Sequence, residues 1–219
     1  MRGDERTTNV RFPTALVCSS PMTDSPAVAP AEPVAELVTV CLDYVRRALK
    51  FELDFTSDTL PVLDHYISTV KGLRAERPEL VPLVTRATGA YFGEVVRGWI
   101  PGFWRVPSPN IVDWELCSRV CFLRFNPIGV AYDSLYGHEE HDGPRSILRC
   151  APEDREFLER RLAVLPPVPP DQYHLFTTRF EVIEVANEAL RARLDEQGYE
   201  GSELTEEDYA RETYNPVLN

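Results

Sequence analysis

LVTRATGAYFGEVVRGWI, residues 83–100, decides the fold of this chain. It is apolar around most of its helical circumference, which is typical of a helix that is buried on nearly all sides. FWRV, residues 103–106, and the run VDWELCSRVCFLRF, residues 112–125, alternate apolar and polar side chains and are rich in Val, Phe and Trp, so together they predict two or three strands of an antiparallel sheet. Pro101-Gly102 breaks the chain between the two runs. We therefore expect a central helix, from Pro78 or Pro82 to Gly98, followed directly by a small sheet.

Gly89 and Gly93 lie four residues apart on one face of that central helix. Because glycine has no Cβ, this spacing lets another helix or a strand approach the backbone closely. A membrane dimerisation motif would need a longer apolar stretch, so we interpret the two glycines as a packing site in a water-soluble protein.

Two helices are predicted before the central one. Apolar residues recur at helical spacing from Val34 to Leu49, with charged residues between them. Thr56-Ser57-Asp58 supplies good N-cap residues for a second helix. Gly72 follows the last apolar position of that helix, so we expect it to close the helix in the left-handed conformation.

Shorter elements are predicted after residue 125. Asn126-Pro127 has the pattern of a helix start, and Gly137 the pattern of its end. A strand at 147–150, a helix over 152–164, a stiff polyproline connector at 166–170 and a last helix over 177–194 complete the order. Helices, then strands, then helices indicate an α+β fold with N-terminal helices, a small antiparallel sheet of three or four strands, and C-terminal helices.

The net charge of -12 is unevenly spread along the chain. Residues 195–219 contribute -7, residues 1–32 contribute -1, and the part between them only -4. We therefore expect a flexible Pro/Ala/Ser-rich leader over 1–32, a single domain over 33–194 and an acidic tail over 195–219. The acidity disfavours a nucleic-acid partner. The tail either stays solvated or docks on a basic partner through its larger side chains, Tyr199, Leu204, Tyr209 and Tyr214.

The cysteines favour a reducing compartment. They are five, an odd number, in a chain that is long enough to bury a core without disulfides. Cys117 and Cys121 are interpreted as buried free thiols; a redox pair is the alternative if Ser118-Arg119 forms a hairpin turn. The N-terminus lacks the apolar run of a signal peptide, so we expect a cytoplasmic protein with no membrane partner.

Glu94 is the charged residue whose surroundings are most unusual, because it lies in the middle of the apolar central helix. A buried carboxylate needs a partner or a raised pKa. Arg97, three residues on, favours a structural ion pair. The alternative is a ligand-binding site between this helix and the sheet, lined by Tyr91, Glu94, Arg97, Trp99 and Trp104.

The loop GHEEHDGPRS, residues 137–146, contains the candidate metal ligands His138 and His141. Their three-residue spacing brings both imidazoles to one side if the loop curls, and three carboxylates accompany them. The glycines and the proline around them instead favour an exposed, solvated turn. No cofactor is predicted beyond a divalent metal at this loop.

Local signatures of catalysis are absent: the chain has no phosphate loop, dinucleotide fingerprint, zincin helix or nucleophile elbow. The succession LDFTSDTLPVLDHYI (53–67), GAYFGEVVRGWIPGFWRV (89–106) and NPIGVAYDSLYG (126–137) resembles uncharacterised bacterial proteins with an S/T-x-x-x-L-x-x-L-D helix and a G-A-x-x-G-E helix before a Trp-bearing strand. The resemblance covers about residues 51–137. It implies a small α+β domain and attaches no activity to Gly89, Gly93 or Glu94.

The expected function is therefore a binding function. We expect a non-catalytic cytoplasmic bacterial protein that binds another protein, as a regulator, an adaptor or an immunity-type factor. The alternative is an enzyme or a small-ligand-binding protein that uses the pocket described for Glu94, with or without a metal ion.

Overall fold

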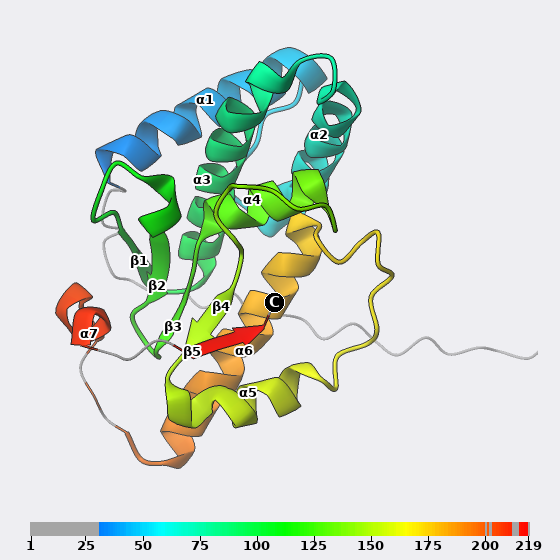
Figure 1. The fold of residues 1–219 in the computed structure, drawn as a ribbon. Helices are drawn as coiled ribbons and strands as arrows, with labels where there is room; N and C mark the ends of the chain where they lie inside the picture. The colour runs from blue at the N-terminus through cyan, green and yellow to red at the C-terminus, as the bar shows by residue number, and fades with distance from the viewer. Residues whose placement is uncertain (1–30, 200, 202, 212–214, 219) are drawn as a thin grey trace, which may run out of the picture.

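The structure is a computed structural model that describes residues 31–199, 201, 203–211 and 215–218. It has an N-terminal layer of helices, a central antiparallel sheet and C-terminal helices (Figure 1). The predicted α+β class is confirmed. The expected leader over 1–32 lies outside the described residues except for Ala31 and Glu32.

Three helices form the N-terminal layer: α1 (Glu32–Leu49), α2 (Leu60–Leu73) and α3 (Val81–Trp99). Single 3-10 turns at Ser57–Thr59 and Pro78–Leu80 lead into α2 and α3. α3 is the buried central helix that its apolar circumference predicts. Within the described part of the chain, no helix combines the length and the apolar character needed to cross a membrane.

The end of α2 differs from the prediction. Gly72 lies inside the helix, and it is not among the described glycines that have a positive φ. Arg74, in the right-handed conformation, caps the helix, and Arg77 N then donates to Leu73 O over 2.9 Å. The chain leaves α2 through a further right-handed turn, so no left-handed residue is needed there.

The two glycines of α3 are sites of close approach, as predicted. A Cβ at Gly89 would clash with the backbone of Ile128, and a Cβ at Gly93 would clash with the ring of Trp104. Ile128 belongs to α4 (Pro127–Tyr136) and Trp104 to β1 (Gly102–Arg105). One face of α3 therefore receives both a helix and a strand.

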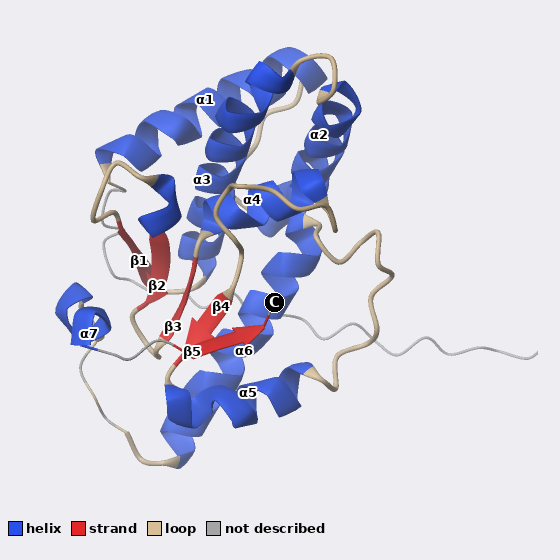
Figure 2. Ribbon diagram, in the orientation of Figure 1, coloured by secondary structure: helices blue, strands red, loops and turns tan. Residues whose placement is uncertain are grey.

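The sheet is antiparallel throughout, in the order β1-β2-β3-β4-β5 (Figure 2). After β1, its strands are β2 (Glu115–Ser118), β3 (Leu123–Phe125), β4 (Leu148–Cys150) and β5 (Asn215–Leu218). The sequence predicts the first four strands. β5 comes from the C-terminal segment and pairs with β4.

Local signals set both ends of α4. The Asn126 side chain accepts a hydrogen bond from Gly129 N over 3.0 Å, and Gly137 ends the helix with a φ of 64°. Both features are confirmed predictions. They fix where the 137–147 loop begins, and that loop supplies much of the candidate site.

The C-terminal helices are α5 (Arg155–Leu162), which follows a 3-10 turn at Pro152–Asp154, and α6 (Phe176–Glu196). The start of α6 is capped from a distance. Asp64 of α2 accepts hydrogen bonds from Phe176 N over 2.6 Å and from Thr177 Oγ1 over 2.9 Å. Burial raises the pKa of Asp64, although these hydrogen bonds oppose the shift. The cap ties α6 to the N-terminal layer.

Part of the expected acidic tail packs on the sheet. α7 (Glu206–Arg211) carries Tyr209, which is 1 % exposed. Its hydroxyl lies 2.7 Å from Ser118 O and accepts a hydrogen bond from Leu123 N over 3.1 Å. Burial raises the pKa of this phenol far above its usual value. Tyr209 therefore docks on this chain itself, whereas Tyr199 is exposed and Tyr214 lies outside the described residues.

Candidate functional site

Glu94, Arg97 and Trp104 form a closed polar cluster between α3 and β1. Arg97 donates to both carboxylate oxygens of Glu94, from Nε over 2.9 Å and from Nη2 over 2.6 Å. Trp104 Nε1 donates to Glu94 Oε1 over 2.7 Å. The side chains of Glu94 and Arg97 are 9 % and 15 % exposed. The ion pair that the three-residue spacing predicts is present, and donors of this chain already occupy the carboxylate.

The other two residues of the sequence-based candidate site lie elsewhere. The Tyr91 hydroxyl accepts a hydrogen bond from Phe55 N over 2.9 Å and lies 3.1 Å from Thr59 Oγ1. Trp99 packs edge-on against Phe180 of α6, with ring centroids 6.2 Å apart. The structure therefore brings Glu94, Arg97 and Trp104 together but does not bring Tyr91 and Trp99 to them.

The space between α3 and the sheet is almost filled. A cavity of about 10 Å³ remains there, lined mainly by apolar side chains such as Val96, Leu116, Phe125 and Ile183. That volume holds about one water molecule at most. None of the five candidate residues lines it.

A larger cavity opens where the end of α4, the 137–147 loop and the start of α6 meet. Its volume is about 560 Å³, which lies within the range of small-ligand sites. Its polar lining includes Asp133, His138, Arg145, Tyr173, His174 and Arg179. We call this space the α4–α6 pocket.

Asp133, on the buried side of α4, organises one wall of the pocket. Its carboxylate accepts hydrogen bonds from Ser146 N over 3.0 Å and from the Ser146 hydroxyl, and it lies 2.8 Å from His141 Nε2. The carboxylate thus stands between the serine and the histidine. A nucleophilic serine needs the histidine beside its own hydroxyl, so this arrangement is not a Ser-His-Asp relay.

Arg179 of α6 carries the least compensated charge in the pocket. The residue is 4 % exposed. Its Nη2 donates to Ser146 O over 3.2 Å, and its guanidinium lies 5.7 Å from the centre of the Tyr173 ring. Its Nε is buried with no hydrogen-bond partner, and within the described residues no carboxylate lies within 4.0 Å of the guanidinium. A buried charge without a counter-charge is costly.

Two imidazoles lie at the same pocket. The rings of His138 and His174 meet edge to face with centroids 5.1 Å apart, and His174 Nε2 is buried with no hydrogen-bond partner. Burial is the main cause that lowers the pKa of His174. His138, Arg179 and Lys71 act in the same direction, and Asp133 opposes them. His174 is therefore uncharged at neutral pH and retains an open hydrogen-bonding position.

The acidic residues of the pocket do not reach Arg179. Glu139 pairs with Arg74 over 2.6 Å, and Asp133 is engaged by Ser146 and His141. Glu140 is exposed. An adjoining cavity of about 390 Å³ shares His138, Glu139 and His174 and adds Lys71. The inner part of the pocket therefore holds the Arg179 guanidinium and the already engaged Asp133 carboxylate, while Glu139 and Glu140 are exposed at its rim.

The two histidines of the candidate metal site make separate contacts. His141 has a side chain that is 1 % exposed and lies on Asp133, whereas His138 is exposed beside His174. In the part of the chain that the structure describes, no group of three His, Cys, Asp or Glu side chains is arranged to hold a metal ion.

The described cysteines are buried free thiols: Cys41, Cys117, Cys121 and Cys150. Residues 119–122 do turn the chain between β2 and β3, but the Cys121 thiol contacts Asn187 Oδ1 at 3.5 Å. Burial raises the pKa of the Cys117 and Cys121 thiols to about 12. Both are therefore protonated and unreactive at neutral pH.

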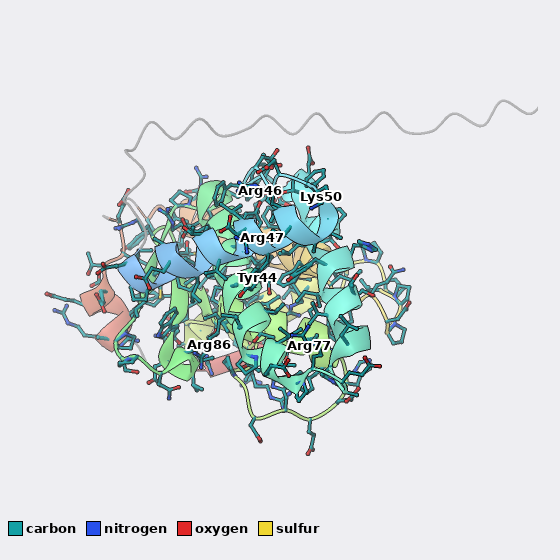
Figure 3. All side chains as sticks on the ribbon, turned by 90° about the horizontal axis from the view of Figure 1, so that it is seen from above. Tyr44, Arg46, Arg47, Lys50, Arg77 and Arg86 are labelled. Atoms are coloured by element: carbon teal, nitrogen blue, oxygen red, sulfur yellow. The ribbon has the colours of Figure 1, made fainter. Side chains whose placement is uncertain are left out.

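A basic surface covers the outer side of the helical layer. Figure 3 labels Arg46 and Arg47 on α1, Lys50 directly after its last residue, and Arg77 and Arg86 in the same view. Arg46 donates to Glu52 over 2.6 Å, and Arg77 donates to Glu79 over 3.1 Å. Much of this surface consists of exposed ion pairs, which contribute little to stability.

Sequence reasoning missed Arg179 and Asp133, although both left a signal. Arg179 is three residues after Phe176 and four before Ile183, so it occupies a position in the apolar stripe of α6. Asp133 lies among the apolar residues of α4. A charged residue in an apolar stripe marks burial. It does not reveal which partner the charge finds.

Comparison with protein-family models, with curated proteins and with solved structures finds no match to this chain. The resemblance noted in the sequence stays a prediction. The α4–α6 pocket is therefore the feature of the chain from which its function is inferred.

Proposed function

We propose that the protein binds a small anionic ligand, through a carboxylate or phosphate group, in the α4–α6 pocket. The observation that carries the proposal is Arg179, a buried guanidinium that lines a cavity and has no carboxylate within reach among the described residues. An anionic group beside it would supply the missing counter-charge and accept charge-assisted hydrogen bonds.

The neighbouring groups support the same ligand chemistry. Arg145, whose Nη1 lies 3.8 Å from Asp133 Oδ1, lines the pocket as a second guanidinium. The unpartnered ring nitrogen of His174 can donate or accept a hydrogen bond. The Tyr173 ring provides an apolar surface for the body of the ligand. No group in the pocket has the arrangement of an activated nucleophile, so the proposed activity is binding.

Isothermal titration calorimetry with sodium phosphate and, separately, sodium acetate tests the proposal. We expect saturable binding of at least one anion by the full chain, and the two titrations distinguish a phosphate ligand from a carboxylate ligand. Arg179→Met should weaken that binding at least about tenfold, because a hydrogen bond to a charged group contributes about 1.5–3 kcal/mol.

Arg160→Met is the matched control, because Arg160 is an exposed arginine of α5 that pairs with Glu156 over 2.6 Å. It should bind the anion like the wild type. Absence of saturable binding for both anions, or equal affinity in Arg179→Met, would refute the proposal.

The protein-binding role expected from the sequence remains a second proposal. The observation that favours it lies outside the pocket, in the exposed proline-rich loop between α5 and α6.

A further inference from the structure

The loop that joins α5 to α6 presents a proline-rich segment to solvent. Its sequence from Leu165 is LPPVPP, and all five residues over 166–170 are exposed. Val168 is 40 % exposed, which is high for an aliphatic side chain. Figure 1 shows this loop, in yellow, projecting from the body of the molecule.

Both ends of the segment are anchored. Leu165 N donates to Leu162 O over 3.1 Å at the end of α5, and Gln172 N donates to Pro169 O over 2.9 Å. Asp64 then holds the first turn of α6. Local turns bound the segment on both sides, and its prolines have a fixed φ, so it loses less conformational entropy on binding than an ordinary loop.

Four prolines in five residues favour the polyproline II conformation, which has three residues per turn. Two pairs, Leu165-Pro166 and Val168-Pro169, are three residues apart and so lie on the same edge of such a helix. This pattern is the form in which aromatic-lined grooves recognise proline-rich segments. Asp171, also exposed, places a negative charge directly after it.

The same chain has a groove with the complementary chemistry. A cavity of about 580 Å³ lies between the start of α3, the segment before β2 and the end of α4. Its lining includes Pro78, Pro82, Val112, Tyr132, Tyr136 and Arg86, and we call it the Pro-Tyr groove. Val112 is 53 % exposed, which leaves an apolar surface open to a partner.

Arg86 places a positive charge at one side of this groove, and the exposed Asp142 also lines it. Arg86 is exposed, and within the described residues no carboxylate lies within 4.0 Å of it. Asp171, directly after the proline-rich segment, carries the negative charge that can pair with Arg86.

We propose that two copies of the chain dock reciprocally, with the LPPVPP segment of each copy in the Pro-Tyr groove of the other and Asp171 paired with Arg86. Such a two-fold arrangement uses the same two surfaces on both copies and closes as a dimer. Each of the two contacts involves a short segment, so we expect a weak dimer.

Sedimentation velocity of the full chain, from about 1 µM to about 500 µM, tests the proposal across the range expected for an interface of this size. We expect a concentration-dependent monomer–dimer equilibrium that weakens as salt screens the Asp171–Arg86 pair. Arg86→Glu should raise the dimer dissociation constant at least about tenfold. The same loss is expected for Pro166→Ala combined with Pro169→Ala.

A charge exchange separates docking from loss of folding. Arg86→Glu combined with Asp171→Arg should restore the wild-type dissociation constant to within about threefold, because it re-forms the pair with the charges reversed. Arg160→Glu, on the exposed face of α5, is the control and should dimerise like the wild type.

Three results would overturn the proposal: a monomer at every concentration, a dimer that Arg86→Glu leaves unchanged, or no recovery in the charge exchange. A monomeric chain that binds a purified SH3 domain through the same prolines would assign the loop to a different protein. That outcome would also overturn reciprocal docking.

Discussion

The Glu94 cluster and the α4–α6 pocket contain similar groups and differ in how their charges are compensated. In the cluster, both oxygens of the Glu94 carboxylate accept hydrogen bonds, from Arg97 and Trp104. In the pocket, the Arg179 guanidinium is more deeply buried, and no carboxylate among the described residues lies within reach. The first arrangement is complete by itself, whereas the second has room for a ligand beside an uncompensated charge.

The difference shows how to distinguish a structural charge from a binding charge. Burial alone does not separate them, because both side chains lie within the fold. Compensation separates them, since a buried ion pair needs both partners, and an unpaired buried cation is tolerated where something else can supply the anion. One substitution, arginine to methionine, applied to each region tests this contrast.

Arg97→Met should give the largest effect. It leaves the Glu94 carboxylate, 9 % exposed, with only the Trp104 donor, and breaking a pair of this kind costs about 3 kcal/mol of unfolding free energy. Urea denaturation followed by tryptophan fluorescence measures the change. Glu94→Leu in the Arg97→Met background should recover most of the loss, because no uncompensated charge then remains. A loss below about 1 kcal/mol in the single variant would show that solvent compensates Glu94.

Arg179→Met should change the unfolding free energy much less than Arg97→Met does. Without added anion, we expect an unfolding free energy within about 1 kcal/mol of the wild type or above it, because the variant removes an uncompensated buried charge and loses one hydrogen bond to Ser146 O. The same urea titration measures it. A loss as large as that of Arg97→Met would mean that Arg179 is a structural residue and would remove the contrast between the two regions.

Much of this contrast lies beyond sequence reasoning, for a physical reason. The limits of α4 follow from Asn126 and Gly137, which act on neighbouring residues. The Glu94–Arg97 pair also follows from local spacing. The charge of Arg179, in contrast, contacts Ser146, 33 residues away, and no carboxylate of any described residue lies within 4.0 Å of its guanidinium. Such relations arise only when distant segments pack.

The C-terminal segment illustrates the same limit. Its acidic composition predicts solvation, yet Tyr209 reaches backbone groups of Ser118 and Leu123, more than 80 residues away. The favourable burial of one aromatic ring outweighs the local composition, because Glu206 and Glu207 of α7 remain exposed while the ring enters the domain. Composition describes the surface of this segment and does not describe its buried residue.

The smallest expected effect concerns pH and refines the description of the pocket. Burial lowers the pKa of His174 in the folded chain, so the unfolded chain binds more protons as pH falls below the ordinary histidine value of about 6.5. The unfolding free energy should therefore be unaffected by His174 above that pH, and the titration of this residue should lower it below that pH. Urea midpoints at pH 7.5 and 5.5 should show a larger decrease for the wild type than for His174→Asn. Because a bound anion favours the charged imidazole, saturating phosphate should reduce the difference between the two proteins if the ligand lies beside His174. An unchanged difference would place the anion away from this histidine, while Arg179 would still be tested by its own variant.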